Sequence, residues 1–470
     1  MFFNSVTFLF SFLPIVLIGF LLLERVKPVF WRQLWLLTAS LVFYAWTNAN
    51  VLLLFLPLTA LNYFLGSRLS RSRESSGKWL LVGSVTLNIV VLAYFKYANF
   101  FVANLNAVLQ TNIFIEKMLL PLGISFITFM QIAWLVAARK REAVPCNYFE
   151  FLLYSAFFPQ IVSGPIVYQK ESLPQFRKMR TAEERSADIC VGATLFTMGL
   201  AKKVLVADTI APWANQAFWA VSVGSPISMA AAWIGALAYA FQLYFDFSGY
   251  SDMAIGLAKL FGFDFHENFR HPYAAISVGD FYRRWHISLG RFFRDYVYIP
   301  LGGNRKYQDR NILIVWFLTG FWHGANWNFA LWGTYFGVLM VLEKHFKFVL
   351  DKTPRFLKHG YTLVLIVFSR AIFYFVDFNQ LSYFIGNLFY SKHAVNPGFL
   401  SDITTHVFWF VLVVLLCIPW DEIYTQDHPV RNQVAIRYAY VRPFANAFLL
   451  ILSTMLLVNA TFNPFLYTRF

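Results

Sequence analysis

Residues 311–342 form an apolar run that contains no Lys, Arg, Asp or Glu and a single histidine, His323. A straight helix of this length would measure roughly 48 Å, whereas the hydrocarbon core of a bilayer is only about 30 Å thick. The run is therefore expected to bend or break, and Gly320 and Gly324, which flank His323, are the natural place. His323 then lies about 18 Å into the run, near the bilayer middle. An ionisable group at that depth is costly and marks a functional site.

The composition extends this interpretation to the whole chain. Hydrophobic residues make up 58% of the 470 residues and charged residues only 13%, whereas soluble domains carry about 25% charged residues. The apolar runs are continuous and do not alternate, which excludes a closed β-barrel. We predict an all-α polytopic membrane protein of about ten to twelve transmembrane helices with re-entrant segments. A single membrane-embedded domain is expected over residues 1–470.

The net charge of +15 indicates cytoplasmic loops rich in Lys and Arg and does not indicate nucleic-acid binding, because no separate basic domain is present. The three cysteines are scattered, so they predict neither a disulfide framework nor a metal site. The histidines outside the candidate site form no metal-ligand pattern either. They are His266, His271, His345, His359, His393, His406 and His428.

The segment 148–168 is expected to enter the membrane and return on the same side. A full crossing would place the basic stretch 170–185 outside, against the tendency of basic loops to stay in the cytoplasm. The centre of the segment also contains Pro159, Gly164 and Pro165, which argue against a straight helix. Irregular backbone at membrane depth requires cover by protein or by a water-filled cavity, so a re-entrant segment predicts a cavity.

His323 is the first candidate catalytic residue. A neutral imidazole, with an ordinary pKa of about 6.5, can take a proton from a hydroxyl group. The alternative is a buried histidine that is hydrogen-bonded within the bundle. His286 is the second candidate, as a residue that positions substrate or stabilises developing charge. Its alternative is an interfacial residue among basic neighbours.

Two other polar features have less specific interpretations. Asp246 and Asp252 resemble a pair of hydrolase carboxylates, but we favour ion pairs with arginines inside the bundle. The expected partners of these carboxylates are Arg283, Arg284 and Arg294. The turn at 301–306 lacks the spacing of a phosphate loop. It is a candidate anion contact for a CoA-like donor through Asn304 and Arg305.

Four ordered motifs within 239–330 resemble the membrane-bound O-acyltransferase family, and more narrowly its bacterial alginate O-acetyltransferase subfamily. They are Tyr244-Phe245-Asp246-Phe247-Ser248-Gly249-Tyr250-Ser251-Asp252, Arg283-Arg284-Trp285-His286-Ile287-Ser288-Leu289, Leu301-Gly302-Gly303-Asn304-Arg305-Lys306 and Trp322-His323-Gly324-Ala325-Asn326. Earlier matches are Tyr94-Phe95-Lys96-Tyr97 and the pair Phe158-Pro159-Gln160 and Gly164-Pro165-Ile166. The resemblance covers about 1–380. It departs at Val136-Ala137-Ala138-Arg139, where relatives typically carry an Asp and a Tyr-Arg.

The resemblance implies a bundle with a central funnel, a catalytic block at about 239–345, an essential His323 and a secondary His286. It implies transfer of an acyl group, usually acetyl from cytosolic acetyl-CoA, across the inner membrane to an exported polysaccharide of the alginate or cellulose type. No cofactor is expected to stay bound. The expected partners are membrane lipid, periplasmic acetyltransferases and a polysaccharide synthase or export complex. The candidate substrate and donor contacts are Trp322, Asn326, Arg283, Arg284, Asn304 and Arg305.

Three alternatives remain open from the sequence. The acceptor could be peptidoglycan or teichoic acid. A transporter or flippase of a lipid-linked sugar could use His323 as a proton relay, although such proteins are commonly built from inverted repeats and we find no repeat. A structural subunit of a polysaccharide synthase would tolerate loss of both His286 and His323.

Overall fold

The computed structural model describes residues 1–466 except 117–119, 163, 395–400, 402, 424–428 and 460–464, and at 421, 429–440 and 459 it describes the backbone alone. Regular structure within these residues is helical, apart from one isolated bridge between Phe269 and Trp285. His428 and Ser163 lie outside the described residues. The all-α prediction is confirmed.

The described chain divides into two compact units. The first comprises Met1–Phe196 and Tyr250–His266, and the second comprises Thr197–Gly249 and Glu267–Leu466. The single domain expected over 1–470 stays a prediction.

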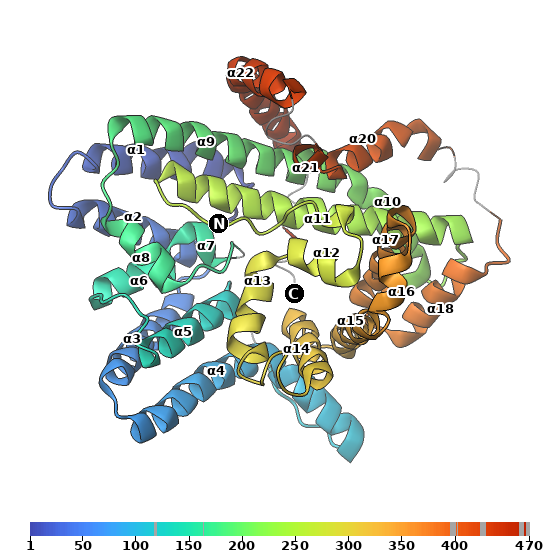
Figure 1. Cartoon of the computed structure of the whole chain (residues 1–470), viewed down its shortest axis with the longest axis horizontal. Helices are drawn as coiled ribbons and strands as arrows, with labels where there is room; N and C mark the ends of the chain where they lie inside the picture. Colours follow the sequence, from blue (N-terminus) through green and yellow to red (C-terminus); the bar gives the residue numbers. More distant parts are fainter. Residues whose placement is uncertain are drawn as a thin grey trace. The chain divides into compact units, whose positions relative to one another are not determined.

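The first unit holds the helices that precede residue 196, together with the end of α11 (Figure 1). Its helices are η1 (Phe8–Phe12), α1 (Leu13–Leu23), α2 (Phe30–Ala45), α3 (Val51–Arg71), α4 (Glu74–Leu109), α5 (Ile124–Arg139), α6 (Tyr148–Ala156), α7 (Phe158–Ile161), α8 (Gln169–Arg177) and most of α9 (Ala182–Ala201).

The second unit holds most of α11 (Met229–Leu260) and the shorter helices that follow it. Its other helices are η2 (Lys202–Ala207), α10 (Asp208–Ser222), η3 (Pro272–Ala274), α12 (Val278–Arg284), α13 (Ile287–Phe293), η4 (Arg294–Tyr298), α14 (Gln308–His323), α15 (Trp327–His345), α16 (Lys347–Lys352), α17 (Arg355–Tyr374), α18 (Phe378–Phe389), α20 (Val407–Cys417), α21 (Trp420–Ile423) and α22 (Pro429–Asn459).

Five helical stretches among the described residues are long and apolar enough to cross a membrane. They are Val51–Arg71, Glu74–Leu109, Ala182–Ser222, Arg355–Tyr374 and Val441–Val458. Three shorter apolar helices are Phe8–Leu23, Ile124–Arg139 and Val407–Cys417. The count of ten to twelve spans stays a prediction, because these stretches are judged by length and composition alone.

A pair of buried amides joins two of these spans. The Asn62 side chain on α3 donates to Asn88 Oδ1 on α4 at 3.1 Å, and Asn88 donates back to Asn62 Oδ1 at 2.7 Å. Side-chain amides satisfy one another in this way where the surroundings offer no water.

The segment 148–168 returns to its starting point, as predicted. The helix breaks at Phe157, whose ψ of 112° is not helical, between α6 and α7. At the end of α8, Arg177 Nε donates to Glu150 Oε1 at 2.7 Å, in the first turn of α6. Arg177 Nη2 also donates to the Pro145 carbonyl at 2.7 Å. The amide N–H of Val144 donates to Gln169 Oε1 at 3.0 Å, so the two flanks of the segment lie side by side.

The basic stretches 25–32 and 170–185 are also held together, so they lie on the same side, and the placement of that side in the cytoplasm stays a prediction. Buried Arg32 donates through Nη2 to the carbonyls of Phe176 and Lys178, at 2.9 Å each. Arg185 forms an ion pair with Glu24, which also pairs with Arg32. One carboxylate thus offsets two partly buried guanidinium groups.

The apolar run 311–342 is broken, as predicted, into an α14–α15 hairpin. α14 ends at His323, Gly324 has extended backbone at φ −167° and ψ 155°, and α15 begins at Trp327. The two helices pack closely because Gly320 and Gly333 face each other. A Cβ at Gly320 would lie 2.8 Å from the Gly333 Cα.

Of the two glycines at which the break was expected, Gly324 lies at the break and Gly320 does not. A Cβ at Gly324 would meet the Phe329 ring at 2.2 Å, and helix α14 continues through Gly320 without a break. Both glycines serve close packing, and substrate access to His323 has to come from its side-chain face.

Candidate active site

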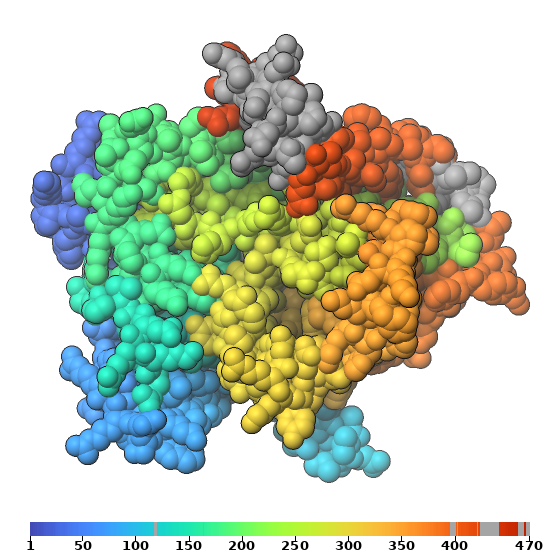
Figure 2. Space-filling view, viewed as in Figure 1, coloured from blue at the N-terminus to red at the C-terminus, as the bar shows by residue number. Residues whose placement is uncertain are grey.

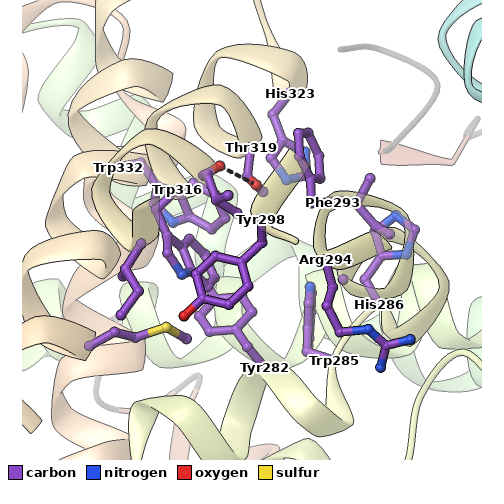
Figure 3. Close-up of a pocket in the computed structure, with 15 residues that line it drawn as sticks. Tyr282, Trp285, His286, Phe293, Arg294, Tyr298, Trp316, Thr319, His323 and Trp332 are labelled. Carbon is purple, nitrogen blue, oxygen red and sulfur yellow. Dashed lines mark hydrogen bonds between the residues drawn. The ribbon is translucent and has the colours of Figure 1, made fainter. Parts of the chain in front are cut away.

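A cavity of about 240 Å³ lies within the second unit, between α12, α13, η4, α14 and α15 (Figure 3). It brings His286 and His323 into one site, although 37 positions separate them in the sequence. The other lining residues are Tyr282, Trp285, Leu289, Gly290, Phe293, Arg294, Tyr298, Ile312, Val315, Trp316, Thr319, Trp332 and Met340. The lining is mostly apolar, so a polar group inside it acts in a poorly screened environment.

One face of α14 forms a wall along the cavity. Ile312, Val315, Thr319 and His323 recur at the three- and four-residue spacing that places side chains on one helix face. Ile312 and His323 are about 16 Å apart along the helix axis. The Thr319 hydroxyl is turned to the backbone, where it donates to the Val315 carbonyl at 2.7 Å (Figure 3). The cavity is therefore elongated, with His323 near one end.

Three aromatic rings surround the imidazole of His323, which is 4% exposed. The ring centroids of Trp322, Trp332 and Phe373 lie 4.9, 5.1 and 5.5 Å from that of His323. These contacts restrict rotation of the imidazole and exclude bulk water.

The position of His323 at the end of α14 also favours base chemistry. The last carbonyl groups of a helix carry a partial negative charge, which stabilises a nearby cation by about 0.3–2 kcal/mol. Because the extended Gly324 ends the helix directly after His323, an imidazolium formed there lies within reach of that charge.

His286 is held by Asn268. The backbone N–H of Ser288 donates to Asn268 Oδ1 at 3.1 Å, and the Ser288 hydroxyl donates to it at 2.9 Å. A backbone N–H can only donate, so this Asn268 atom is the oxygen. His286 Nδ1, 3.2 Å from the same oxygen, therefore carries the proton. The basic lone pair of neutral His286 is on Nε2.

The surroundings of His286 keep its imidazole neutral. His286 precedes α13, a seven-residue helix too short to cross a membrane, and is 2% exposed. Its ring lies edge-on to Phe247, at 4.7 Å and 90°. Burial among aromatic rings disfavours the charged form of the imidazole. His286 also has φ 47° and ψ 53°, a left-handed backbone conformation uncommon outside glycine.

Trp332 contributes a polar group that the sequence did not indicate. Its ring lines the cavity beside His323, with ring planes at 89°, and the residue is 2% exposed. Its indole N–H has no hydrogen-bond acceptor among the described residues. A buried hydrogen-bond donor without an acceptor is costly. The indole N–H is therefore suited to donate a hydrogen bond to an acceptor atom that the substrate supplies.

Arg370 on α17 places a positive charge behind the wall of the cavity. Its guanidinium carbon lies 4.8 Å from the ring centroid of Trp285, and the residue is 1% exposed. Trp285 in turn lines the cavity. The contact has the geometry of a buried cation–π interaction.

The turn that includes Asn304 adjoins another part of the cavity wall. Tyr298, a lining residue, donates its hydroxyl to Asn304 Oδ1 at 2.5 Å, and Gln308 Nε2 donates to the same oxygen at 3.0 Å. Arg305 is exposed in this turn. Asn304 therefore orients a lining tyrosine without lining the cavity itself, and its predicted contact with the donor stays a prediction.

The other predicted contacts lie beside the cavity. Trp322 is buried between the two histidines, with its ring centroid 6.2 Å from His286 and 4.9 Å from His323. Asn326 is the half-buried residue before α15. Arg283 has a 73% exposed side chain near Asp280, and Arg284 pairs with Asp280 and with Glu422 at 2.8 Å. None of these four side chains lines the cavity.

The expected ion pair between Asp246 and an arginine was wrong. Asp246 is 1% exposed and pairs with Lys203 at 2.6 Å, while Lys203 also contacts Asp208 at 2.9 Å. The amide N–H of Leu466 donates to Asp246 Oδ2 at 2.9 Å. Asp246 is thus paired inside the bundle, as favoured, but with a lysine that no motif marked.

The remaining acidic residues and histidines of the described chain form no candidate metal site. His345 is exposed and contacts Asp309 at 2.9 Å. Among the described residues that were searched, no group of three His, Cys, Asp or Glu side chains is suited to hold a metal ion.

A family model matches most of the chain. It is described as MBOAT, membrane-bound O-acyltransferase family, and the match covers residues 34–385. The chain belongs to the membrane-bound O-acyltransferase family. It is therefore an integral membrane O-acyltransferase, as the motifs predicted.

Three relatives illustrate the similarity of this acyltransferase to named proteins. It is 41% identical to the probable alginate O-acetylase AlgI of Azotobacter vinelandii, over 79% of this chain and 75% of the relative. It is 35% identical to the protein of the same name from Pseudomonas putida over the full length of both. It is 37% identical to the peptidoglycan O-acetyltransferase of Helicobacter pylori, over 73% of this chain and 70% of the relative.

Several residues of this acyltransferase site were not found from the sequence. The helical spacing back from His323 would have indicated Thr319, Val315 and Ile312 on its face. No comparable signal marks Trp332 or Arg370, because aromatic residues are common throughout the chain and arginines are usually exposed.

Proposed function

We propose that this acyltransferase moves an acetyl group from cytosolic acetyl-CoA across the bacterial inner membrane to hydroxyl groups of an exported polysaccharide of the alginate or cellulose type. The observation that carries the proposal is the position of His323, at the end of α14, in a cavity that His286 also lines. The names of the alginate relatives support the choice of acceptor.

In the proposed reaction His323 acts as general base. Its imidazole takes the proton of the acceptor hydroxyl while the hydroxyl oxygen attacks the carbonyl carbon of the thioester. The carbon–sulfur bond then breaks, and the proton passes from His323 to the leaving thiolate. The products are the acetyl ester and free CoA.

The oxyanion that forms at the carbonyl carbon needs a hydrogen-bond donor. Trp332 is the proposed donor, because its buried indole N–H lacks an acceptor in the described chain and its ring adjoins His323. A donor fixed in advance in an apolar site stabilises such a charge without reorganisation. The neutral His286, with its lone pair on Nε2, is proposed to position the acceptor hydroxyl.

The donor thioester is proposed to occupy the length of the cavity, with Asn304 and Arg305 near its charged part. The elongated shape suits a narrow arm that ends beside His323. No bound cofactor is part of the proposal. Membrane lipid surrounds the enzyme, and periplasmic acetyltransferases together with a polysaccharide synthase or export complex are its proposed partners.

Peptidoglycan is the second candidate acceptor, because the relative from Helicobacter pylori is named for it. The donor chemistry would be the same. Only the polymer that carries the ester would differ.

The test is acetylation of surface polymers in a deletion strain that carries plasmid copies of the gene. His323→Ala is expected to lower ester content about 10²–10⁴-fold, the usual contribution of a general base, while the protein still accumulates in the membrane. His345→Ala is the matched control, since this exposed histidine lies outside the cavity. Mass spectrometry of the polysaccharide and of the peptidoglycan identifies the acceptor. Full acetylation in His323→Ala would contradict the proposal and favour a transporter or a structural subunit.

A further inference from the structure

In the first unit α3 leads directly into α4 (Figure 1). A second cavity, of about 780 Å³, lies where α3 ends and α4 begins. Atoms of this part of the chain, blue in Figure 2, lie on the face that the view presents. The lining residues that matter here are Phe64, Ser67, Arg68, Arg71, Ser76 and Leu80.

Two positive charges in this cavity have no carboxylate partner. Neither Arg68 nor Arg71 forms an ion pair with any residue that the structure describes, and both are exposed. The guanidinium carbon of Arg68 lies 4.9 Å from the ring centroid of Phe64, which restricts its orientation. A planar guanidinium offers paired N–H donors that match the oxygens of a phosphate.

The cavity lies at the end of two candidate membrane spans. α3 and α4 are both long and apolar enough to cross, and the basic stretch 68–73 comprises the last turn of α3 and the short connection to α4. Exposed aromatic rings, Phe64 at 54% and Trp79 at 74%, flank it in the manner of an interfacial belt. Aromatic rings and basic residues at the end of two spans are typical of the headgroup region, and basic residues favour its cytoplasmic side.

The lining of the cavity combines a polar part and an apolar part. Arg68, Arg71 and the hydroxyls of Ser67 and Ser76 supply hydrogen-bond donors, whereas Phe64 and Leu80 supply apolar surface. A free phosphate ion would contact only the hydrogen-bond donors of the polar part. An anionic phospholipid contacts both parts, because its phosphate and its acyl chains lie next to each other.

We propose that this cavity binds the headgroup of an anionic phospholipid, with the phosphate between Arg68 and Arg71 and the acyl chains along Phe64 and Leu80. The site is separate from the histidine cavity, and the proposal does not depend on the acyl-transfer reaction. The attraction of the anionic cytoplasmic leaflet for basic side chains supplies the driving force.

The test is native mass spectrometry of the full-length protein in detergent, titrated with phosphatidylglycerol and, separately, with phosphatidylcholine. Phosphatidylglycerol is expected to bind at least tenfold more tightly. Each of Arg68→Gln and Arg71→Gln is expected to weaken that binding about fivefold, the typical contribution of one basic side chain near an anionic surface. Ser76→Leu, which keeps the charge and fills the cavity from an exposed position, is expected to weaken it as well.

Arg73→Gln is the matched control. It removes the same charge from the same loop, but Arg73 does not line the cavity. Unchanged binding in Arg73→Gln supports a built site, whereas an equal loss there would overturn it in favour of diffuse charge attraction. Displacement of phosphatidylglycerol by millimolar inorganic phosphate would also overturn the proposal, because the occupant would then be a free anion. Undiminished binding in the Arg68→Gln, Arg71→Gln double variant is the third contradicting result.

Discussion

The indole of Trp332 lies edge-on to the imidazole of His323, with ring centroids 5.1 Å apart and ring planes at 89°. The first residue belongs to α15 and the second ends α14, so the hairpin itself sets the contact. One ring supplies the proposed base and the other the proposed oxyanion donor. The chemistry therefore depends on how closely two helices pack.

Trp332→Phe is predicted to lower the rate of acyl transfer about 10²–10³-fold, because an oxyanion donor is lost while an aromatic ring remains. The measurement is kcat with purified enzyme in lipid nanodiscs and a soluble acceptor. Trp316→Phe is the control, since Trp316 also lines the cavity. A similar loss of kcat in both variants would point to packing and would exclude a specific role of the Trp332 N–H.

Asn268→Leu is predicted to disorder His286, because Nδ1 and the Ser288 N–H both lose their acceptor. Each unsatisfied buried donor costs about 1–3 kcal/mol, so Tm in detergent and kcat should both fall. Asn268→Asp restores an acceptor and should recover much of the stability. A carboxylate there also raises the pKa of His286, so activity that needs neutral His286 should be lost at a higher pH than in the wild type. An unchanged pH profile in Asn268→Asp would argue against a role for His286.

Gly320→Ala is predicted to destabilise the protein by about 1–3 kcal/mol, because the new methyl group would overlap the backbone of α15. Thermal unfolding in detergent measures the effect. Gly386→Ala on α18 is the control, since a Cβ there meets nothing within 4 Å. It should leave stability unchanged or raise it by up to about 1 kcal/mol. Equal Tm values for both variants would contradict the close approach of α14 and α15.

Glu150→Gln is predicted to loosen the re-entrant segment. The hydrogen bond from Arg177 is the main cause that lowers the pKa of Glu150, so the folded state favours its ionised form. The stabilisation is present above the ordinary glutamate pKa of about 4.3 and is lost as the pH falls through the lowered pKa. Wild type should therefore be more stable than Glu150→Gln at neutral pH, and the difference should vanish in acid. Limited proteolysis across pH measures this, and a difference that persists in acid would exclude the ion pair as its source.

Much of the fold follows from local properties of the chain. The break near His323 could be predicted because a charge-free run longer than a bilayer cannot form one straight span. The return of 148–168 could be predicted because prolines interrupt it and because basic residues follow it. The role of Gly320 was not predictable, since a glycine that breaks a helix and one that lets two helices touch look the same in a sequence.

The candidate site was only partly predictable. His323 was identifiable as the one ionisable group in an apolar run and His286 through its motif, and their shared cavity agrees with that choice. The positions of Arg283 and Arg284 outside the cavity were not predictable, because a motif fixes neighbours in the chain and not the direction of each side chain. The partner of Asp246 was missed for the same reason, since Lys203 is distant in sequence.

The sequence by itself determined that this protein is a helical membrane acyltransferase and indicated His286 and His323 as its candidate catalytic residues. Hydrophobicity and the order of the motifs decide those points, because both can be read along the chain without knowing which distant segments are in contact. Only the tertiary structure decided that Trp332 adjoins His323, that Asn268 sets the tautomer of His286 and that Arg370 lies behind Trp285. Each of these contacts joins separate segments, and its geometry depends on helix packing that local sequence does not encode.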